Sequence, residues 1–156
     1  MPAVFENFGV HFLYPENWSI TDEEDDGWPC TVTVQSAETG FWSLHVYPPQ
    51  HDVQEVVQEL IAVIQGEFGE VEVLPAIETF GETETAGVDL AFFYLDLLVE
   101  AKIRYLHTPS GTLVWLYQAE SREFEKIEPI FQAIAVSMLR TPTPHLNKGG
   151  RAGKMR

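Results

Sequence analysis

The stretch LVWLY, residues 113–117, decides the fold that this sequence predicts, because it is apolar at every position. Successive side chains of a β-strand point to opposite faces, so the odd-numbered positions share one face and the even-numbered positions share the other. A strand that is apolar on both faces needs cover on both sides. We therefore expect residues 113–119 to form a strand away from the open border of a sheet, with other elements packed against each face.

An amphipathic helix in the middle of the chain can cover one of these faces. In residues 51–69, HDVQEVVQELIAVIQGEFG, the apolar positions recur at spacings of three and four, which places them in one stripe along a helix. Asp52 can cap the first turn, and Glu55, three places later, completes a capping-box arrangement. Gly66 and Gly69 mark the end of this helix.

A second helix is predicted near the C-terminus and can cover the other face. Its apolar residues recur with the same spacing over residues 127–138. Pro129 belongs in the first turn, where its missing N–H removes no hydrogen bond. The sequence TPTP at residues 141–144 ends the helix.

Short runs rich in β-branched and aromatic residues predict strands before and after the first helix. They lie at residues 10–14, 31–35, 42–47, 72–80, 88–107 and 113–119, with a further short strand at 18–21. The run at 88–107 is too long for one strand and should turn or bend near residues 96–98. Its odd-numbered positions stay apolar from Phe93 to Tyr105, whereas a two-residue loop would switch the parity of the inward face. We therefore expect a loop of odd length or a bent strand.

Together these elements predict an α+β fold with a mostly antiparallel sheet of about six strands and helices on both faces, an α/β/α sandwich. The length of 156 residues favours one domain, which we place at residues 1–140. Residues 141–156 form a basic, glycine-rich tail that we expect to be flexible.

The composition is that of a soluble globular protein, with 45% hydrophobic and 21% charged residues. The single cysteine, Cys30, excludes a disulfide within the chain and fits a reducing compartment. The N-terminus does not have the pattern of a secretory signal, and no run of 18 apolar residues is present. A cytoplasmic location is the expectation that follows.

The strong negative charge narrows the class of partner. All 24 acidic residues and only five basic ones precede residue 145, a balance of −19, and the basic tail brings the net charge to −15. Such a body repels nucleic-acid backbones and anionic membrane surfaces. A protein with a basic surface is the partner that the charge favours, and neither nucleic acid nor a membrane is expected to bind.

Four features resemble a known superfamily. They are YPENW at residues 14–18, a helix after the first strands, the run AFFYLDLLVEAKIRYLH at residues 91–107, and the terminal helix FQAIAVSMLR at residues 131–140. In these features the chain resembles the superfamily of the photosystem protein PsbP and the Ran-binding nuclear-import factor Mog, together with small bacterial relatives of unknown role. The likeness covers most of residues 8–140. It implies an antiparallel sheet with helices on both faces, in proteins that usually bind partners and carry out no chemistry. It brings no catalytic residues, and a targeting segment like that of secreted or lumenal members is not expected.

A run of acids between two tryptophans is the candidate partner-binding site. Its side chains combine exposed charge with aromatic area, which together suit a protein interface. The candidate residues are Trp18, Asp22, Glu23, Glu24, Asp25, Asp26 and Trp28. Three of the acids match the start of a calcium-loop template, but its twelfth position is Thr33 and not glutamate. A weak cation site and a simply solvated loop therefore remain as alternatives. For each tryptophan, packing in the core is the alternative to a role as an anchor, because so large a side chain gains much from burial.

No motif for catalysis, cofactor binding or metal binding is found. The five histidines do not pair at metal-binding spacing, and the sequence contains no G-x-S-x-G, G-x-G-x-x-G or phosphate-loop motif. Asp96, Glu100, Lys102 and Arg104 share one parity, and we interpret them as cross-strand ion pairs on a partly exposed face. The leading hypothesis is a non-enzymatic binding or accessory module that uses its acidic surface. The alternatives are a small-ligand or divalent-metal-binding protein with hydrolytic activity, and a homodimer.

Overall fold

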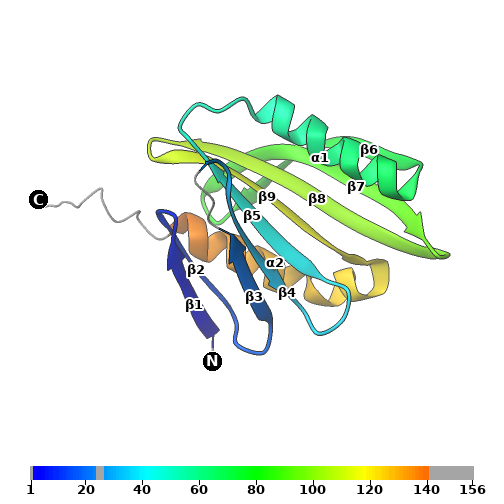
Figure 1. Ribbon diagram of the computed structural model, residues 1–156. Coiled ribbons are helices and arrows are strands. Elements are labelled where there is room, and N and C mark those ends of the chain that lie inside the picture. The colour runs from blue at the N-terminus through cyan, green and yellow to red at the C-terminus, as the bar shows by residue number, and fades with distance from the viewer. Residues whose placement is uncertain (1, 24–26, 141–156) are drawn as a thin grey trace, which may run out of the picture.

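The computed structural model describes residues 2–23 and 27–140, which form nine strands and two helices (Figure 1). The strands are β1 (Pro2–Asn7), β2 (Val10–Pro15), β3 (Ser19–Glu23), β4 (Cys30–Gln35), β5 (Phe41–Tyr47), β6 (Val71–Phe80), β7 (Thr83–Tyr94), β8 (Leu97–Thr108) and β9 (Gly111–Glu120). The helices are α1 (Val53–Phe68) and α2 (Ser121–Arg140). Neither of these helices is long and apolar enough to cross a membrane.

Seven of the strands form one antiparallel sheet in the order β3-β4-β5-β9-β8-β7-β6, and β1 pairs with β2 in a separate hairpin. The predicted α+β class and the mostly antiparallel sheet are confirmed, but the sheet has seven strands where about six were expected. The extra hairpin partner, β1, was not predicted. Only Phe5 is buried in its alternating pattern, so the apolar periodicity of this strand is weak.

The central strand β9 divides the buried side chains into two clusters, as its sequence predicted. Trp115 and Tyr117 belong to a cluster with α2 and with Phe12 of the β1–β2 hairpin. Val114 and Leu116 belong to a second cluster with α1. Because β9 lies between β5 and β8, its backbone is paired on both edges and its side chains are buried on both faces.

Helix α1 begins and ends with the residues that the sequence indicated. The Asp52 carboxylate accepts hydrogen bonds from the backbone N–H groups of Gln54 and Glu55, at 3.0 and 3.3 Å. At the other end, Gly69 has a φ of 88° and its N–H donates to the Gln65 carbonyl at 2.9 Å. The helix thus stops at a residue that tolerates positive φ. Gly66, in contrast, lies inside α1.

Helix α2 starts earlier than expected, at Ser121, directly after β9. Pro129 therefore lies inside the helix and not in its first turn. Polar residues in the first two turns hide the helical pattern there, so the start was placed too late. Pro129 is on the exposed side, where water can bond the carbonyl that lacks its usual N–H donor.

The long run between residues 83 and 108 is a hairpin with a two-residue loop, which corrects the prediction of an odd loop or a bent strand. Tyr94 pairs with Leu97, and the loop residues Leu95 and Asp96 both have positive φ, 50° and 67°. The positions that point into the core do change across this loop from even-numbered to odd-numbered. Before the loop Phe92 points inward, and after it Val99, which pairs with Phe92, points inward. The prediction was wrong because it assigned the apolar side chains of the hairpin end to the core.

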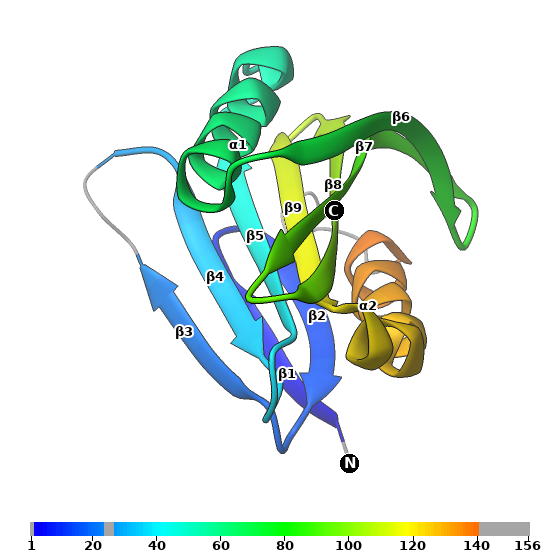
Figure 2. The same ribbon diagram turned by 90° about the vertical axis from the view of Figure 1, so that its right-hand side faces the viewer.

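The far end of the β6–β7 hairpin curls toward α2 (Figure 2). Phe80 packs edge-on against Trp115 with ring centroids 5.8 Å apart, and so joins the cluster of α2. At the bend, a Cβ atom on Gly87 would lie 1.8 Å from the Ile103 carbonyl oxygen, so β7 and β8 approach too closely there for any side chain. The sheet consequently has a curved face on the side of α2.

Candidate binding surfaces

The first tryptophan of the predicted partner site belongs to the core. Trp18 is 8% exposed and meets Phe131 of α2 edge-on, with ring centroids 5.9 Å apart. The backbone N–H of Trp18 donates to the Pro15 carbonyl at 3.0 Å, which closes the turn between β2 and β3. The predicted role of Trp18 as an exposed anchor is therefore corrected: its side chain joins the N-terminal strands to α2.

The other described residues of this site are at the surface. Asp22 and Glu23 are exposed at the end of β3, the strand at one border of the sheet, and Trp28 is 58% exposed just before β4. Glu24, Asp25 and Asp26 lie outside the described residues. Asp22 and Glu23 pair with Val32 and Thr31 of β4, so their side chains point to opposite faces of the sheet. The site is thus a charged border with one exposed indole beside it.

The histidines and the cysteine do not assemble into a metal centre in residues 2–23 and 27–140, where no group of three or more potential ligands is found. His45 lies within 3.3 Å of the Thr31 hydroxyl, and burial lowers the pKa of its imidazole. His107 contacts the Thr112 hydroxyl at 3.1 Å. These two side chains hold neighbouring strands together through hydroxyl groups.

Arg104 is the centre of a charged network on the side of the sheet that faces α2. Only 2% exposed, it donates from Nε to Glu78 Oε1 at 2.9 Å and from Nη2 to Asp89 Oδ1 at 2.7 Å. Its Nη1 donates to the carbonyls of Val88 and Ile103, both at 3.1 Å. The predicted pairs on a partly exposed face are therefore corrected: the arginine is buried, and its partners are on β6 and β7.

The network continues from the sheet to α2. The Tyr117 hydroxyl donates to the same Glu78 oxygen at 2.7 Å, and Gln132 donates to the other oxygen at 3.2 Å. Burial raises the pKa of the Tyr117 phenol; Arg104 opposes this shift and Glu78 adds to it. The phenol therefore stays protonated and remains a donor. The arrangement satisfies every group with a partner, as a structural network requires.

A second carboxylate, Glu123, joins α2 to the loop between β4 and β5. It accepts hydrogen bonds from the Ser36 hydroxyl at 2.7 Å, from the Thr39 N–H at 2.8 Å and from the Thr39 hydroxyl. Burial raises the pKa of Glu123, but the hydrogen bonds from Thr39, Ser36 and Gly40 outweigh it, so the pKa lies below its ordinary value. This ionised carboxylate holds the loop against the first turn of the helix.

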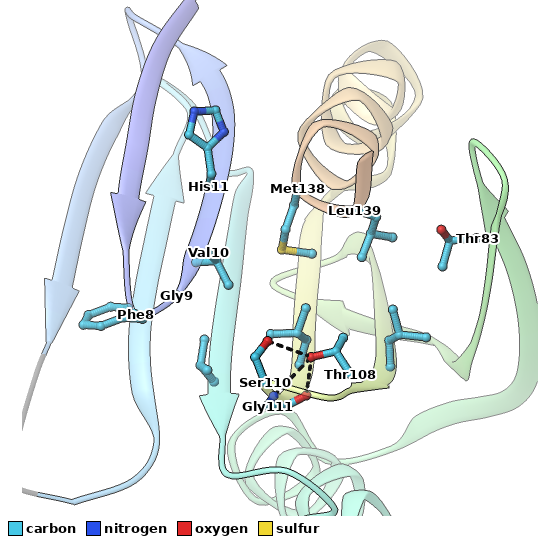
Figure 3. Close-up of a pocket in the computed structure, with 13 residues that line it drawn as sticks. Phe8, Gly9, Val10, His11, Thr83, Thr108, Ser110, Gly111, Met138 and Leu139 are labelled. Atoms are coloured by element: carbon cyan, nitrogen blue, oxygen red, sulfur yellow. Dashed lines mark hydrogen bonds between the residues drawn. The ribbon is translucent and has the colours of Figure 1, made fainter. Parts of the chain in front are cut away.

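A small pocket of about 130 Å³ opens at the end of the molecule where the β1–β2 and β8–β9 turns meet the last turn of α2 (Figure 3). The Thr108 hydroxyl donates to the Gly111 carbonyl at 2.8 Å, so it is used within its own turn. In Figure 3 the His11 ring lies on the opposite side of the pocket from Ser110 and Thr108. The polar groups of the pocket do not converge on one point.

A larger apolar groove of about 470 Å³ lies between β2 and α2. Leu13 and Pro15 line it from the hairpin, and Pro129 and Ile130 from the helix. The Leu13 N–H donates to the Ser137 hydroxyl at 2.9 Å across the junction. The groove is the seam between two packed elements.

The largest concentration of exposed apolar side chains is at the turn between β7 and β8. We call residues 93–98, FYLDLL, the β7–β8 tip; its five apolar side chains are between 36% and 77% exposed. The tip lies at the right-hand extremity of the molecule in Figure 1. This surface was not predicted, because the apolar residues of the tip were assigned to the core. The signal that could have revealed it is their apolar character on both faces at a turn.

The comparisons with known proteins show a fold and no more. No protein-family model and no curated protein matches the chain. Among solved structures, the chain is similar to cyanobacterial PsbP (CyanoP) from Synechocystis sp. PCC 6803, with a TM-score of 0.58 and 12% identity over 87% of this chain and 90% of that one. It is also similar to PA94 from Pseudomonas aeruginosa, a protein of unknown function, with a TM-score of 0.50 and 9% identity over 92% of this chain and 98% of that one. The protein has a PsbP-like fold, as its resemblance in sequence implied.

Proposed function

We propose that this protein is a non-enzymatic binding or accessory module that recognises a protein with a basic surface. The observation that carries the proposal is the charge of residues 1–144, which include 24 acidic residues and only five basic ones. A field of one sign attracts partners of the opposite sign and speeds their encounter. Because exposed charges are screened by salt, binding weakens as the ionic strength rises.

The recognised surface in this proposal includes the border at β3. Asp22 and Glu23 provide charge there, and the exposed Trp28 provides aromatic area of the kind that anchors interfaces. The proposed architecture is the α/β/α sandwich, supported by the two clusters that place Trp115 with α2 and Val114 with α1. A cytoplasmic location is part of the proposal, since the lone Cys30 fits a reducing compartment.

The test compares two variants that lose the same charge at different places. The purified chain is immobilised and used to retain proteins from a cell extract at about 50 mM and about 500 mM salt, where charge screening differs strongly. We expect a basic protein to be retained at low salt only, and less of it by the variant with Asp22→Asn and Glu23→Gln. The control carries Glu82→Gln and Glu84→Gln, at two exposed positions beside the β6–β7 turn, and should retain as much as the unmodified chain. Retention of no protein, or equal retention by all three chains at both salt concentrations, would contradict the proposal.

A further inference from the structure

We propose that the β7–β8 tip inserts as an apolar knob into a pocket on the partner protein, and that lysine or arginine side chains form the rim of that pocket. The proposal rests on the proposed function, which makes the partner a basic protein, and it names the contact that gives the complex its specificity. Charge alone brings two proteins together, whereas a buried apolar anchor supplies most of the energy of a complex.

The tip presents apolar side chains on both faces of a protruding hairpin. Phe93 pairs with Leu98 on one face, and Tyr94 pairs with Leu97 on the other. Leu95, in the turn, is 77% exposed. The hairpin continues beyond the end of the neighbouring strand, because the last residue of β9, Glu120, pairs only as far as Val99. The five side chains offer about 500 Å² of surface, at about 200 Å² for a large side chain, which is at the upper end for a patch on a monomer.

Leu95 occupies a position that folding alone does not favour for leucine. Its φ of 50° places it in the left-handed region, where asparagine, aspartate and glycine are the residues that two-residue turns prefer. A leucine at this position costs conformational free energy, and its side chain gains nothing in return because it is exposed. A residue that breaks a local rule without a benefit to folding points to a function. In the complex, burial of this side chain recovers the cost.

Carboxylates next to the tip explain why the rim of the partner pocket is basic. A hollow of about 320 Å³ beneath the tip is lined by Tyr94 and Leu97 together with Phe68, and the exposed Glu67 lies on its wall. A lysine or arginine side chain fits such a surface, with its aliphatic stem on the rings and its charge beside the carboxylate. Asp96 adds a further negative charge within the tip itself.

A second copy of this chain and an anionic membrane fit the tip less well. Two tips in contact bury about 500 Å² on each side, below the about 800 Å² per partner that a stable pair needs. Each copy also has a net charge of −15, which opposes self-association and repels anionic lipids. A basic protein is attracted by this charge instead of repelled, and a pocket on it can enclose both faces of the tip and also contact the carboxylates around it, which adds to the buried area.

The experiment uses two synthetic helical peptides as probes and two variants of the full chain. The leucine–lysine peptide has leucines along one face of the helix and lysines on the other faces. The serine–lysine peptide is the same except that serines replace the leucines. Leu95→Asn removes the knob and suits the left-handed turn, so the thermal midpoint of this variant should equal or exceed that of the unmodified chain. The control is Val63→Asn on α1, because Val63 is 66% exposed and the two residues have similar helix propensities.

We expect the leucine–lysine peptide to bind the unmodified chain and the Val63→Asn variant equally, and to bind Leu95→Asn about tenfold more weakly, the effect of losing one buried leucine. The serine–lysine peptide should bind all three chains alike. If Leu95→Asn binds the leucine–lysine peptide with unchanged affinity, the proposed role of the tip is wrong, but the proposed function stays in place. Binding of neither peptide to the unmodified chain at low salt counts against both proposals. If analytical ultracentrifugation shows a dimer that Leu95→Asn abolishes, the tip binds a second copy of this chain. If the chain floats with phosphatidylcholine vesicles, the tip binds a membrane. Either result overturns the proposal.

Discussion

Arg104 and Glu78 are joined by a hydrogen bond of 2.9 Å although their strands, β8 and β6, are not neighbours in the sheet. The guanidinium reaches over β7, where Asp89 accepts a second hydrogen bond. Glu78 also accepts from Tyr117 of β9, so one carboxylate connects the border strand β6 with the central strand. The curl of the β6–β7 hairpin toward α2 is therefore held by charge as well as by the contact of Phe80 with Trp115.

Replacement of Arg104 with methionine should lower the free energy of unfolding by about 3 kcal/mol, because it leaves two carboxylates without their common partner. The measurement is urea unfolding at pH 7 followed by tryptophan fluorescence. The control is Arg122→Met, which removes an ion pair with Glu120 in which the arginine is 79% exposed. Exposed pairs contribute about 0–1 kcal/mol, so this change should have little effect. Equal losses in the two variants would show that the network does not stabilise the fold.

Glu123 should make the stability of the protein depend on pH in the acid range. Its pKa in the folded protein lies below the ordinary 4.5, so the folded state takes up this proton less readily than the unfolded state. The stabilisation is then complete above about pH 4.5 and is lost as the pH falls through the lower, folded-state pKa. Glu123→Gln should lower the free energy of unfolding by about 1–2 kcal/mol at pH 7.

The loss caused by Glu123→Gln should shrink as the pH falls below about 4.5, because the unfolded wild-type chain then takes up the proton more readily than the folded one. The loss becomes smallest once the pH is below the folded-state pKa and the carboxylate is neutral in the folded protein as well. Thermal unfolding at a series of pH values from 7 to 3 measures both quantities. Glu125→Gln, at an exposed position of the same helix, is the matched control and should change the free energy of unfolding at pH 7 by less than about 0.5 kcal/mol. A loss of the same size at every pH would mean that the hydrogen bonds do not depend on ionisation.

Gly87 and Gly66 should respond to alanine in opposite directions. A Cβ at Gly87 would lie 1.8 Å from a backbone oxygen of β8, so Gly87→Ala must push two strands apart and should destabilise by about 1–3 kcal/mol. Around Gly66, inside α1, nothing lies within 4 Å of such an atom. Gly66→Ala should stabilise by about 0.5–1 kcal/mol, because alanine is the better helix former. The measurement is the thermal unfolding midpoint of each variant, compared by calorimetry with that of the unmodified chain. A higher midpoint for Gly87→Ala would contradict the close approach of β7 and β8.

Features that depend on nearby residues were predictable from the sequence. The caps of α1 are set by Asp52 and Gly69, which lie next to the helix, and the central position of β9 follows from its apolar side chains on both faces. The antiparallel sheet follows from short strands in succession. These predictions need no knowledge of which distant segments meet.

Features that depend on distant contacts were not predictable in the same way. The burial of Trp18 is decided by Phe131, more than a hundred residues away, and that of Arg104 by carboxylates on two other strands. The exposure of the β7–β8 tip was not predictable for a different reason. Apolar residues such as Phe93 normally indicate a core, and periodicity cannot distinguish a core from an exposed apolar surface that has a role in binding.

The two tryptophans of the predicted partner site should separate stability from binding. Trp18→Ala removes a side chain packed against Phe131 and should lower the free energy of unfolding by about 3–5 kcal/mol. Trp28→Ala, at a side chain that is 58% exposed, should change stability by less than about 0.5 kcal/mol. In the retention experiment, however, Trp28→Ala should reduce binding of the basic partner, because an exposed indole beside Asp22 and Glu23 is the anchor in the proposed interface. Urea unfolding and retention at low salt measure the two effects on the same preparations. If Trp28→Ala retains the partner fully, Trp28 is not an anchor and the border at β3 contributes charge alone.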